Sequence, residues 1–308
     1  QKSSNFDIWP FYASEFERYL SGVGLIDNLL TYELIKSSIQ TSSASKQTFY
    51  LYEGQPWEKV LNSVSVCLNR ELPVAVQHST VRFWDLRYFQ HLLELPERDE
   101  MEGHFPKKIV VNGELSFRML GKRPAQQELI ILESLRYRRS PSIQREFLDT
   151  SEKVSPVILG SFLPEDDEYI LELLEEIAPE LANIEFTFKP HPLATKPFLS
   201  KSVAINSSSQ ELWPLLQGAT HVLIGSSTSA VLEVIEAKIP FAVFLPPSTV
   251  NLSPLNGVAG VEFLANSIQL LNFLAKNRQE FLNGLNVEDL ITAHANLDLW
   301  KHFLRKSK

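Results

Sequence analysis

The chain has 308 residues, 44% of them apolar, and a formal net charge of −8 from 29 basic and 37 acidic side chains. This length predicts two domains with cores of about 150 residues each. The acidic balance argues against a nucleic-acid-binding protein, because it provides no general basic surface for phosphates. The single cysteine, Cys67, excludes an internal disulfide framework and a cysteine-based zinc cluster, and it is typical of a reducing compartment.

The first 45 residues have apolar side chains at helical spacing. Gly22-Val23-Gly24 interrupts them, but it lacks a preceding strand and the third glycine of a dinucleotide-binding fingerprint. We therefore expect a turn between two helices there. No stretch of about 18 uninterrupted apolar residues predicts a membrane span, and no signal-peptide pattern is present.

A β-α-β unit follows, and its continuation predicts a first sheet of three or four strands. The expected strands are 48–52, 72–76 and 108–111, with helices at 57–68 and 114–120, and the segment 128–135 fits either a strand or a helix. The polar, proline-bearing segment 138–156 is the best linker and the candidate domain boundary.

Beyond the linker, strands and helices alternate regularly, which predicts a parallel, doubly wound α/β sheet. The expected strands are 156–160, 184–188, 203–205, 222–224 and 241–245, and the expected helices are 166–177, 210–216, 230–237, 268–282 and 287–304.

Two short motifs lie where predicted strands of this second half give way to helices. They are Phe188-Lys-Pro-His-Pro192 and Gly225-Ser-Ser-Thr-Ser229. Ligands of open α/β sheets bind at the carboxyl ends of the strands. Hydroxyl groups and unpaired backbone N–H groups at the start of a helix favour an anion, so a phosphate is the expected guest.

These motifs, with Glu233 on the following helix and Lys238-Ile-Pro240 before the next strand, resemble the nucleotide-binding half of GT-B glycosyltransferases. The resemblance is specific over residues 156–266. It is greatest to bacterial sialyltransferases and β-Kdo transferases, which use CMP-activated acidic sugars to build surface polysaccharides. It implies that His191 contacts the donor phosphate and that Ser226 and Ser227 bind the phosphate of CMP.

The resemblance also implies the organisation of the whole chain. Residues 1–145 would form a short, acceptor-side Rossmann-like domain, and residues 146–308 the nucleotide-sugar domain, with the last helix packing back on the first domain. The segments 50–58, 77–78 and 135–137 are more similar to the β-Kdo transferase group, which favours CMP-Kdo as donor. A cytoplasmic enzyme is implied, attached peripherally to the inner face of the membrane through a lipid-linked acceptor.

Other side chains near the motifs are weaker nucleotide-binding candidates. Glu233 lies two turns into the helix, where a GT-B glutamate holds the donor ribose, although a solvated helix carboxylate explains it equally well. Thr228 adds a hydroxyl beyond the needs of helix capping. Lys189 could add charge to the phosphate site or face water. With no Asp-x-Asp motif in the sequence, we expect neither a metal nor another cofactor.

In the first half, Glu53 is the leading catalytic candidate, because it follows a strand and precedes Gly54, which leaves space for a ligand. It would act as general base towards an acceptor hydroxyl. Asp166 and Asp167 are reserve catalytic candidates, since helix capping alone explains them.

Gln55, Gln77, His78 and Arg82 also follow strands of the first half, and we expect them to bind the acceptor sugar or the donor carboxylate. Three other functions stay open. They are a nucleotide-sugar epimerase, a polyol-phosphate transferase and a non-catalytic glycan-binding remnant.

Overall fold

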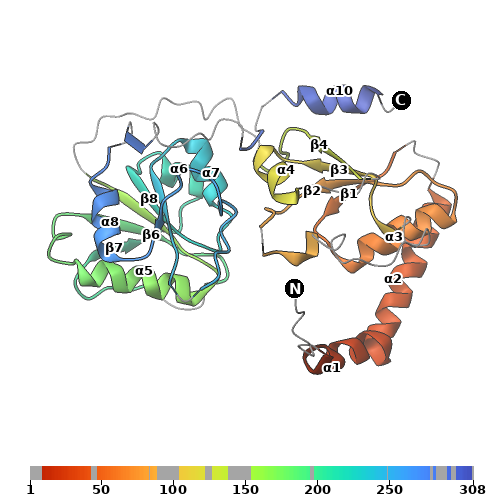
Figure 1. The fold of residues 1–308 in the computed structure, drawn as a ribbon, viewed down its shortest axis with the longest axis horizontal. Coiled ribbons are helices and arrows are strands. Elements are labelled where there is room, and N and C mark those ends of the chain that lie inside the picture. Colours follow the sequence, from red (N-terminus) through yellow and green to blue (C-terminus); the bar gives the residue numbers. More distant parts are fainter. Residues whose placement is uncertain are drawn as a thin grey trace, which may run out of the picture.

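The computed structural model describes residues 9–42, 47–82, 84–88, 104–121, 127–137, 154–194, 198–247, 249–277, 280–281, 290–292 and 296–306. Two parallel sheets lie side by side, each with helices on its faces (Figure 1). The α/β fold with two Rossmann-like units is thereby confirmed. The predicted boundary at residues 145 and 146 lies outside the described residues.

Two helices precede the first sheet. They are α1 (Trp9–Leu20) and α2 (Gly22–Thr41). Only Ser21 separates them, so Gly22-Val23-Gly24 forms the first turn of α2 rather than a longer connection. The second helix packs against α3 (Pro56–Cys67) and extends away from the sheet (Figure 1).

The first sheet has four parallel strands in the order of the chain: β1 (Phe49–Tyr52), β2 (Val74–Gln77), β3 (Lys108–Val111) and β4 (Glu128–Ile131). The ambiguous segment 128–135 therefore begins as a strand. The short helix η1 (Leu86–Tyr88) follows β2, and α4 (Glu114–Leu120) connects β3 to β4.

Successive side chains of a strand point to opposite faces, and each face of the first sheet has its own apolar cluster. Ala75, Ile109 and Val111 join Tyr50 and Tyr52 on one face. The other face carries its own set of apolar residues, which pack against Trp300: Val74, Val76, Val110 and Leu132. Trp300 belongs to α10 (Asp298–Lys306), so the last described helix covers the second face of the first sheet (Figure 1).

The buried carboxylate of Glu133 fixes this last helix. Its two oxygens accept hydrogen bonds from the backbone N–H groups of Leu299 and Trp300, at 2.7 and 3.1 Å. The indole N–H of Trp300 donates to the Glu133 carbonyl at 2.7 Å. A negative charge at a helix N-terminus satisfies unpaired N–H groups and complements the helix dipole.

The second sheet has six parallel strands in the order β10-β9-β8-β5-β6-β7. Its strands are β5 (Pro156–Leu159), β6 (Glu185–Lys189), β7 (Ala204–Ser207), β8 (His221–Gly225), β9 (Phe241–Phe244) and β10 (Phe263–Leu264). The helices that pack on it are α5 (Pro164–Glu176), α6 (Leu212–Leu216), α7 (Val231–Ala237) and α8 (Ser267–Leu274).

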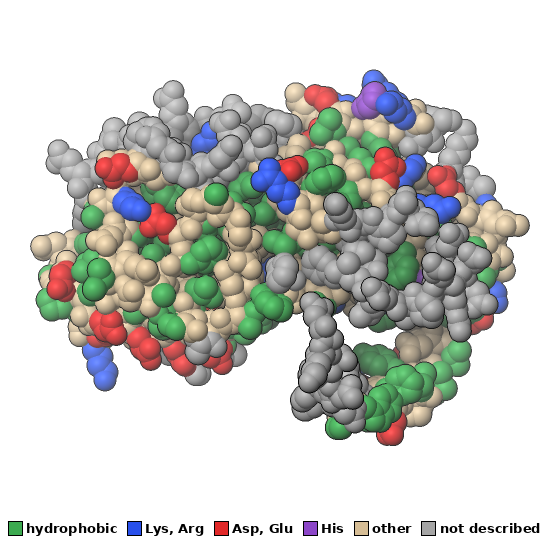
Figure 2. Space-filling view, viewed as in Figure 1, with side chains coloured by type: hydrophobic (Ala, Val, Ile, Leu, Met, Phe, Trp, Pro, Cys, Tyr) green, Lys and Arg blue, Asp and Glu red, His purple; other side chains and the backbone are tan. Residues whose placement is uncertain are grey.

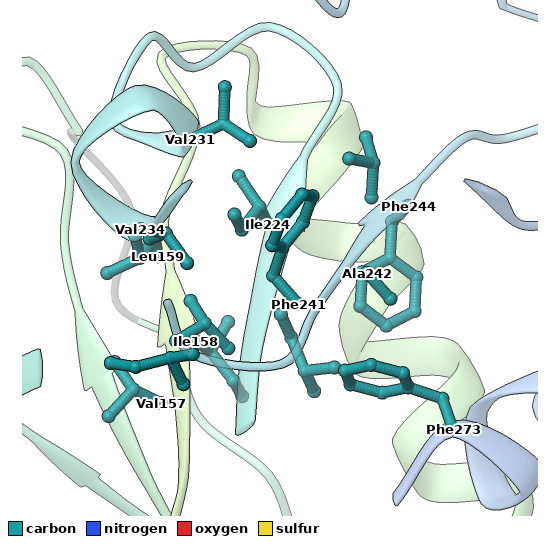
Figure 3. Close-up of a cluster of buried hydrophobic side chains, with 14 of the residues drawn as sticks. Val157, Ile158, Leu159, Ile224, Val231, Val234, Phe241, Ala242, Phe244 and Phe273 are labelled. Atoms are coloured by element: carbon teal, nitrogen blue, oxygen red, sulfur yellow. The ribbon is translucent and has the colours of Figure 1, made fainter. Parts of the chain in front are cut away.

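The core of the second sheet is the largest apolar cluster of the described chain (Figure 3). Ile158 and Ile224 from the central strands lie among Val231 and Val234 of α7. The same cluster includes Leu115 and Tyr137, which come from the first half of the chain. The two halves therefore share buried apolar contacts.

Two sequence-based predictions for the C-terminal region were wrong in detail. The helix predicted at 268–282 ends at Leu274, and the short strand β10 was not predicted. Of the helix predicted at 287–304, the described residues 290–292 form a turn and a bend that hydrogen-bond to the first half, and α10 begins at Asp298. Thr292 N donates to Asn112 O at 2.8 Å, and Ser134 N donates to Thr292 O at 2.7 Å.

Within the described ranges, none of the helices combines the length and apolar character needed to cross a membrane.

Replacing Glu133 by Ala tests how the last helix is held. The change leaves two helix N–H groups without their charged acceptor, so we expect the free energy of unfolding to fall by about 2–3 kcal/mol. Amide hydrogen exchange should become faster in α10 and in β2. Glu128→Ala is the matched control, because this acid is exposed at the start of β4, the strand that precedes Glu133. Equal effects of the two variants would contradict this role of Glu133.

Candidate functional site

The candidate site lies where the strand order of the second sheet reverses. The chain runs from β5 outward to β6 and β7, then returns to the other side of β5 as β8. Strands β5 and β8 are hydrogen-bonded neighbours, with Leu159 opposite Ile224. Ligands of open α/β sheets bind at such a switch point, outside the carboxyl ends of the strands.

Two glycines allow the loops at this switch point to approach closely. A Cβ atom on Gly225 would lie 2.9 Å from Asp166 Oδ2 and 3.0 Å from Ser161 Cβ. A Cβ atom on Gly160 would lie 2.9 Å from the ring of Phe188. Any larger residue at either position would therefore push the loops after β5, β6 and β8 apart.

A buried polar network joins the loops after β5 and β8. Asp166 Oδ2 accepts hydrogen bonds from Ser227 N at 3.3 Å and from Ser227 Oγ at 3.1 Å. The hydroxyl of Ser227 also contacts that of Ser161. Asp166, Ser161 and Ser227 each have an exposed fraction of 2%. Ser227 can give its donors to a phosphate only by releasing Asp166.

The other reserve acid, Asp167, holds the start of the same loop. Its Oδ1 accepts a hydrogen bond from Ser161 N at 2.8 Å. Burial raises the pKa of Asp167 from 3.8 to about 6, and the neighbouring Asp166 carboxylate adds to this shift. Both acids lie in the first turn of α5, which begins at Pro164, two residues before the predicted start.

Ser226 and Thr228 of the motif are also buried, whereas Ser229 is half-buried. Ser226 is 2% exposed and Thr228 is 7% exposed. Thr228 Oγ1 accepts a hydrogen bond from Ala230 N at 3.3 Å, just before α7. Thr228 therefore stabilises the turn between β8 and α7.

His191 lies on the other side of the loop that follows β5. Its ring is 6.2 Å from that of Phe162, centroid to centroid, and its Nδ1 accepts a hydrogen bond from Leu193 N at 3.2 Å. Partial burial lowers the pKa of His191, which favours the neutral ring. With Nδ1 as acceptor, the neutral ring carries its proton on Nε2 and can donate from there.

Lys189 ends β6, and its Nζ donates a hydrogen bond to the Gln210 carbonyl at 2.5 Å. This contact ties β6 to the loop before α6. A phosphate contact from Lys189 stays a prediction, and it would require the ammonium group to leave that carbonyl.

Arg82 connects the two halves of the chain at this site. It follows β2, and its Nη2 donates a hydrogen bond to the Ser227 carbonyl at 2.7 Å. Burial lowers the pKa of the guanidinium, although Asp85 opposes the shift. Within the described part of the chain, the buried Arg82 Nε has no hydrogen-bond partner. The carboxyl ends of β2 and β8 therefore meet, and one N–H of Arg82 remains for a ligand.

Glu233 provides a buried acceptor from the second half. Its Oε2 has no hydrogen-bond partner among the described residues. Burial raises the pKa of Glu233, whereas Arg136 lowers it. The Tyr137 phenol interacts electrostatically with both Glu233 and Arg82, and it lies 3.4 Å from Thr80 Oγ1. Arg82 Nε of the first half and Glu233 Oε2 of the second half, neither of which has a partner among the described residues, thus both lie near the Tyr137 phenol.

Glu53 follows β1 on the edge of the first sheet. Its Oε1 accepts a hydrogen bond from Ser79 Oγ at 2.8 Å. A side chain at position 54 would clash with the Arg87 carbonyl, because an added Cβ atom would lie 2.5 Å from that oxygen. Gly54 nevertheless lines a cavity together with Gln55 and Arg87. Ligand binding beside Gly54 stays a prediction. Gly54 also has a φ of +70°, a conformation that glycine adopts most readily.

The other substrate-binding candidates hold the loops of the first sheet. Gln77 donates to Ser79 O at 3.0 Å and to Ser116 Oγ at 2.8 Å, while its Oε1 accepts from Asn112 N at 2.9 Å. Gln55 precedes α3, and its N–H donates to Glu58 Oε1 at 2.9 Å. His78 is half-buried in the loop after β2. Substrate contacts from these three residues stay predictions.

The sequence analysis did not identify Ser161, which lies at the centre of the polar network. Its signal was the pair Gly160-Ser161, two small residues directly after a central strand and shortly before Pro164. Tyr137 contributed only to the family resemblance, and its electrostatic interaction with both Arg82 and Glu233 joins residues of the two halves.

Comparison of the fold with solved structures identifies GT-B proteins as neighbours. The glycotransferase of kitacinnamycin aligns with a TM-score of 0.54 at 11% identity, over 90% of this chain and 80% of the other. The glycosyltransferase SnogD from Streptomyces nogalater and the S. aureus MnaA–UDP complex each align with a TM-score of 0.50 at 11% identity, over 89% of this chain and 78% of the other. No family model matches the sequence, and no curated protein matches it. The likeness establishes the GT-B fold.

The raised pKa of Asp167 predicts a pH-dependent effect of Asp167→Asn. A carboxyl whose pKa is raised by folding stabilises the fold while it is protonated, and this contribution is lost as the pH rises from about 4 to about 6. The amide keeps the acceptor for Ser161 N but never ionises. We therefore expect the variant to melt about 2–4 °C higher than the wild type at pH 7.5.

At pH 4 the variant and the wild type should have the same melting temperature. Thermal unfolding across the pH range will measure this. Glu172→Asn, at an exposed position of α5, is the control. A difference that does not change with pH would contradict the raised pKa.

Proposed function

We propose that the protein is a glycosyltransferase that moves an acidic sugar, Kdo or a sialic-acid-like sugar, from a CMP-activated donor to a surface-polysaccharide acceptor. The observation that carries this proposal is a pair of buried groups where the two halves meet, Arg82 Nε and Glu233 Oε2, neither of which has a hydrogen-bond partner among the described residues. An unpaired buried polar group costs about 1–3 kcal/mol, so a ligand that satisfies both atoms is favoured.

The two groups suit different parts of an activated acidic sugar. A guanidinium N–H binds a phosphate or carboxylate oxygen, and Arg82 keeps Nε for this while Nη2 holds the Ser227 carbonyl. A carboxylate accepts hydrogen bonds from a pair of ribose hydroxyls, which is the role proposed for Glu233. His191 Nε2 and the Ser226 hydroxyl would add neutral donors to the phosphate.

The proposed reaction needs one base and one leaving group. Glu53 takes the proton of an acceptor hydroxyl, the acceptor oxygen bonds to the anomeric carbon, and the bond from that carbon to the phosphate oxygen breaks. CMP then departs as a monophosphate, whose charge Arg82 and the serine donors stabilise. Asp166 and Asp167 are the alternative catalytic acids, although Asp166 already orients Ser227.

The first test is a thermal-shift panel of CMP, CDP, UDP and GDP. Stabilisation grows with the ratio of ligand concentration to dissociation constant, so the preferred nucleotide should give the largest shift. We expect CMP to lead. A larger shift with UDP would indicate that the donor carries UDP rather than CMP. No shift with any nucleotide would favour a non-catalytic glycan-binding protein.

The role of Glu233 can be separated from the stability of the fold by comparing CMP with 2′-deoxy-CMP. In the wild type, loss of the 2′-hydroxyl should weaken binding about tenfold, which corresponds to about 1.4 kcal/mol for a hydrogen bond to a carboxylate. In Glu233→Ala, CMP and 2′-deoxy-CMP should bind equally. Calorimetric titration measures all four affinities, with Glu172→Ala as a surface control. If CMP still binds about tenfold more tightly than 2′-deoxy-CMP in Glu233→Ala, Glu233 does not bind the ribose.

Glu53→Gln tests the proposed base. The amide keeps the size of the side chain but loses its basicity, so turnover should fall by about two to four decades while CMP affinity stays unchanged. Glu71→Gln, at an exposed position of the same half, should leave both unchanged. Near-normal turnover in Glu53→Gln would show that Glu53 is not the base, and Asp166 and Asp167 would be the next candidates.

The proposed enzyme needs no metal, because a monophosphate leaving group can be stabilised by hydrogen-bond donors and a guanidinium. In the turnover assay used for Glu53→Gln, the wild-type protein is therefore expected to remain active in EDTA. Its loss, with recovery in magnesium or manganese, would contradict a metal-independent reaction. A lipid-linked acceptor and a peripheral, cytoplasmic place at the membrane belong to the same proposal, and an assay with lipid-linked acceptors tests them.

A further inference from the structure

The two N-terminal helices form an arm on the first half of the molecule, defined as α1 and residues 22–34 of α2. The second half of α2 packs against α3, and Ile35 and Ile39 are half-buried there. Residues 22–34 extend beyond this contact and carry α1 at their far end (Figure 1). The arm is therefore anchored at one end only.

The arm exposes an unusual number of large apolar side chains. Ten of them have exposed fractions between 38% and 73%: Trp9, Phe16, Tyr19, Leu20, Val23, Leu25, Ile26, Leu29, Leu30 and Leu34. No residue of α2 is fully buried. The apolar surface covers the arm at the lower right of Figure 2.

The size of this surface demands a partner. Ten half-exposed side chains of this kind present about 1,000 Å² of apolar area, whereas the largest apolar patch of a typical monomer is about 300–600 Å². Val23, Ile26, Leu30 and Leu34 follow helical spacing and form one continuous stripe. Such a stripe is typical of a helix that packs against another helix.

The charges of α1 and α2 argue against a lipid surface as the occupant of the arm. Arg18 pairs with Glu15 at 2.6 Å, and Lys36 pairs with Glu33 at 3.4 Å, both within one helix. Glu17 and Asp27 remain, so four acids and two bases leave the two helices with a net charge of −2. Amphipathic helices that bind anionic membranes are instead rich in lysine and arginine.

We propose that the arm is a dimerisation surface whose occupant is the arm of a second copy of this chain. A two-fold axis would pair the same patch on both copies, so each arm would cover the other. Burying most of the exposed apolar area gives about 800 Å² per partner, the size of a standard stable interface. This proposal is independent of the reaction proposed above.

The oligomeric state of the full chain tests the proposal. Sedimentation velocity from nanomolar to tens of micromolar concentration should show a wild-type dimer. Ile26→Glu/Leu30→Glu places two charges in the stripe and should weaken dimerisation roughly 100-fold or more. The matched control is Val66→Glu/Ile268→Glu, which makes the same charge change at positions 46% and 69% exposed on α3 and α8. The control should remain dimeric.

Thermal unfolding will show whether the double variant is folded. If it is not, Leu30→Ala alone should still weaken dimerisation about tenfold. A monomeric wild type at all concentrations would overturn the proposal, as would a dimer that persists in the folded double variant. A monomer that binds phosphatidylcholine vesicles, or one that dimerises only through Cys67, would also overturn it.

Discussion

The first sheet has two apolar faces, and the end of the chain supplies the cover for one of them. Trp300 packs on that face, and the buried Glu133 carboxylate accepts the first N–H groups of its helix. The chain leaves the first half, forms the second sheet and then returns to the first half as α10. The second half is therefore connected to the first at both of its ends. Arg82 and the Ser227 carbonyl form a further contact between the two halves.

The candidate site combines groups that are already satisfied with groups that are not. Asp166 holds both donors of Ser227, so the motif that suggested a phosphate site is partly occupied by a carboxylate of the same chain. A phosphate beside Asp166 would meet a like charge, and the positive charge of Arg82 can offset it. Arg82 Nε and Glu233 Oε2 have no hydrogen-bond partner in the part of the chain that the structure describes, so they carry more functional information than the serines do.

The arm places its apolar side chains on the outside of the molecule rather than in either core. Its helices are rich in apolar side chains, and among the described elements α2 packs closely on α1 and α3. Pairing with a second copy would complete this packing at the periphery of the first half.

The sequence alone determined the alternation of strands and helices, because buried parallel strands read as short apolar runs whose period differs from that of helices. It also located the motifs at Pro190-His191 and Ser226-Ser227, since both follow such runs. It could not determine which strands are neighbours. The switch point between β5 and β8, the contact of Ser227 with Asp166 and the meeting of Arg82 with the second half all join residues far apart in the chain. Only the tertiary structure decided them, because such contacts depend on the order of the strands and on the return of the last helix, which no local pattern encodes.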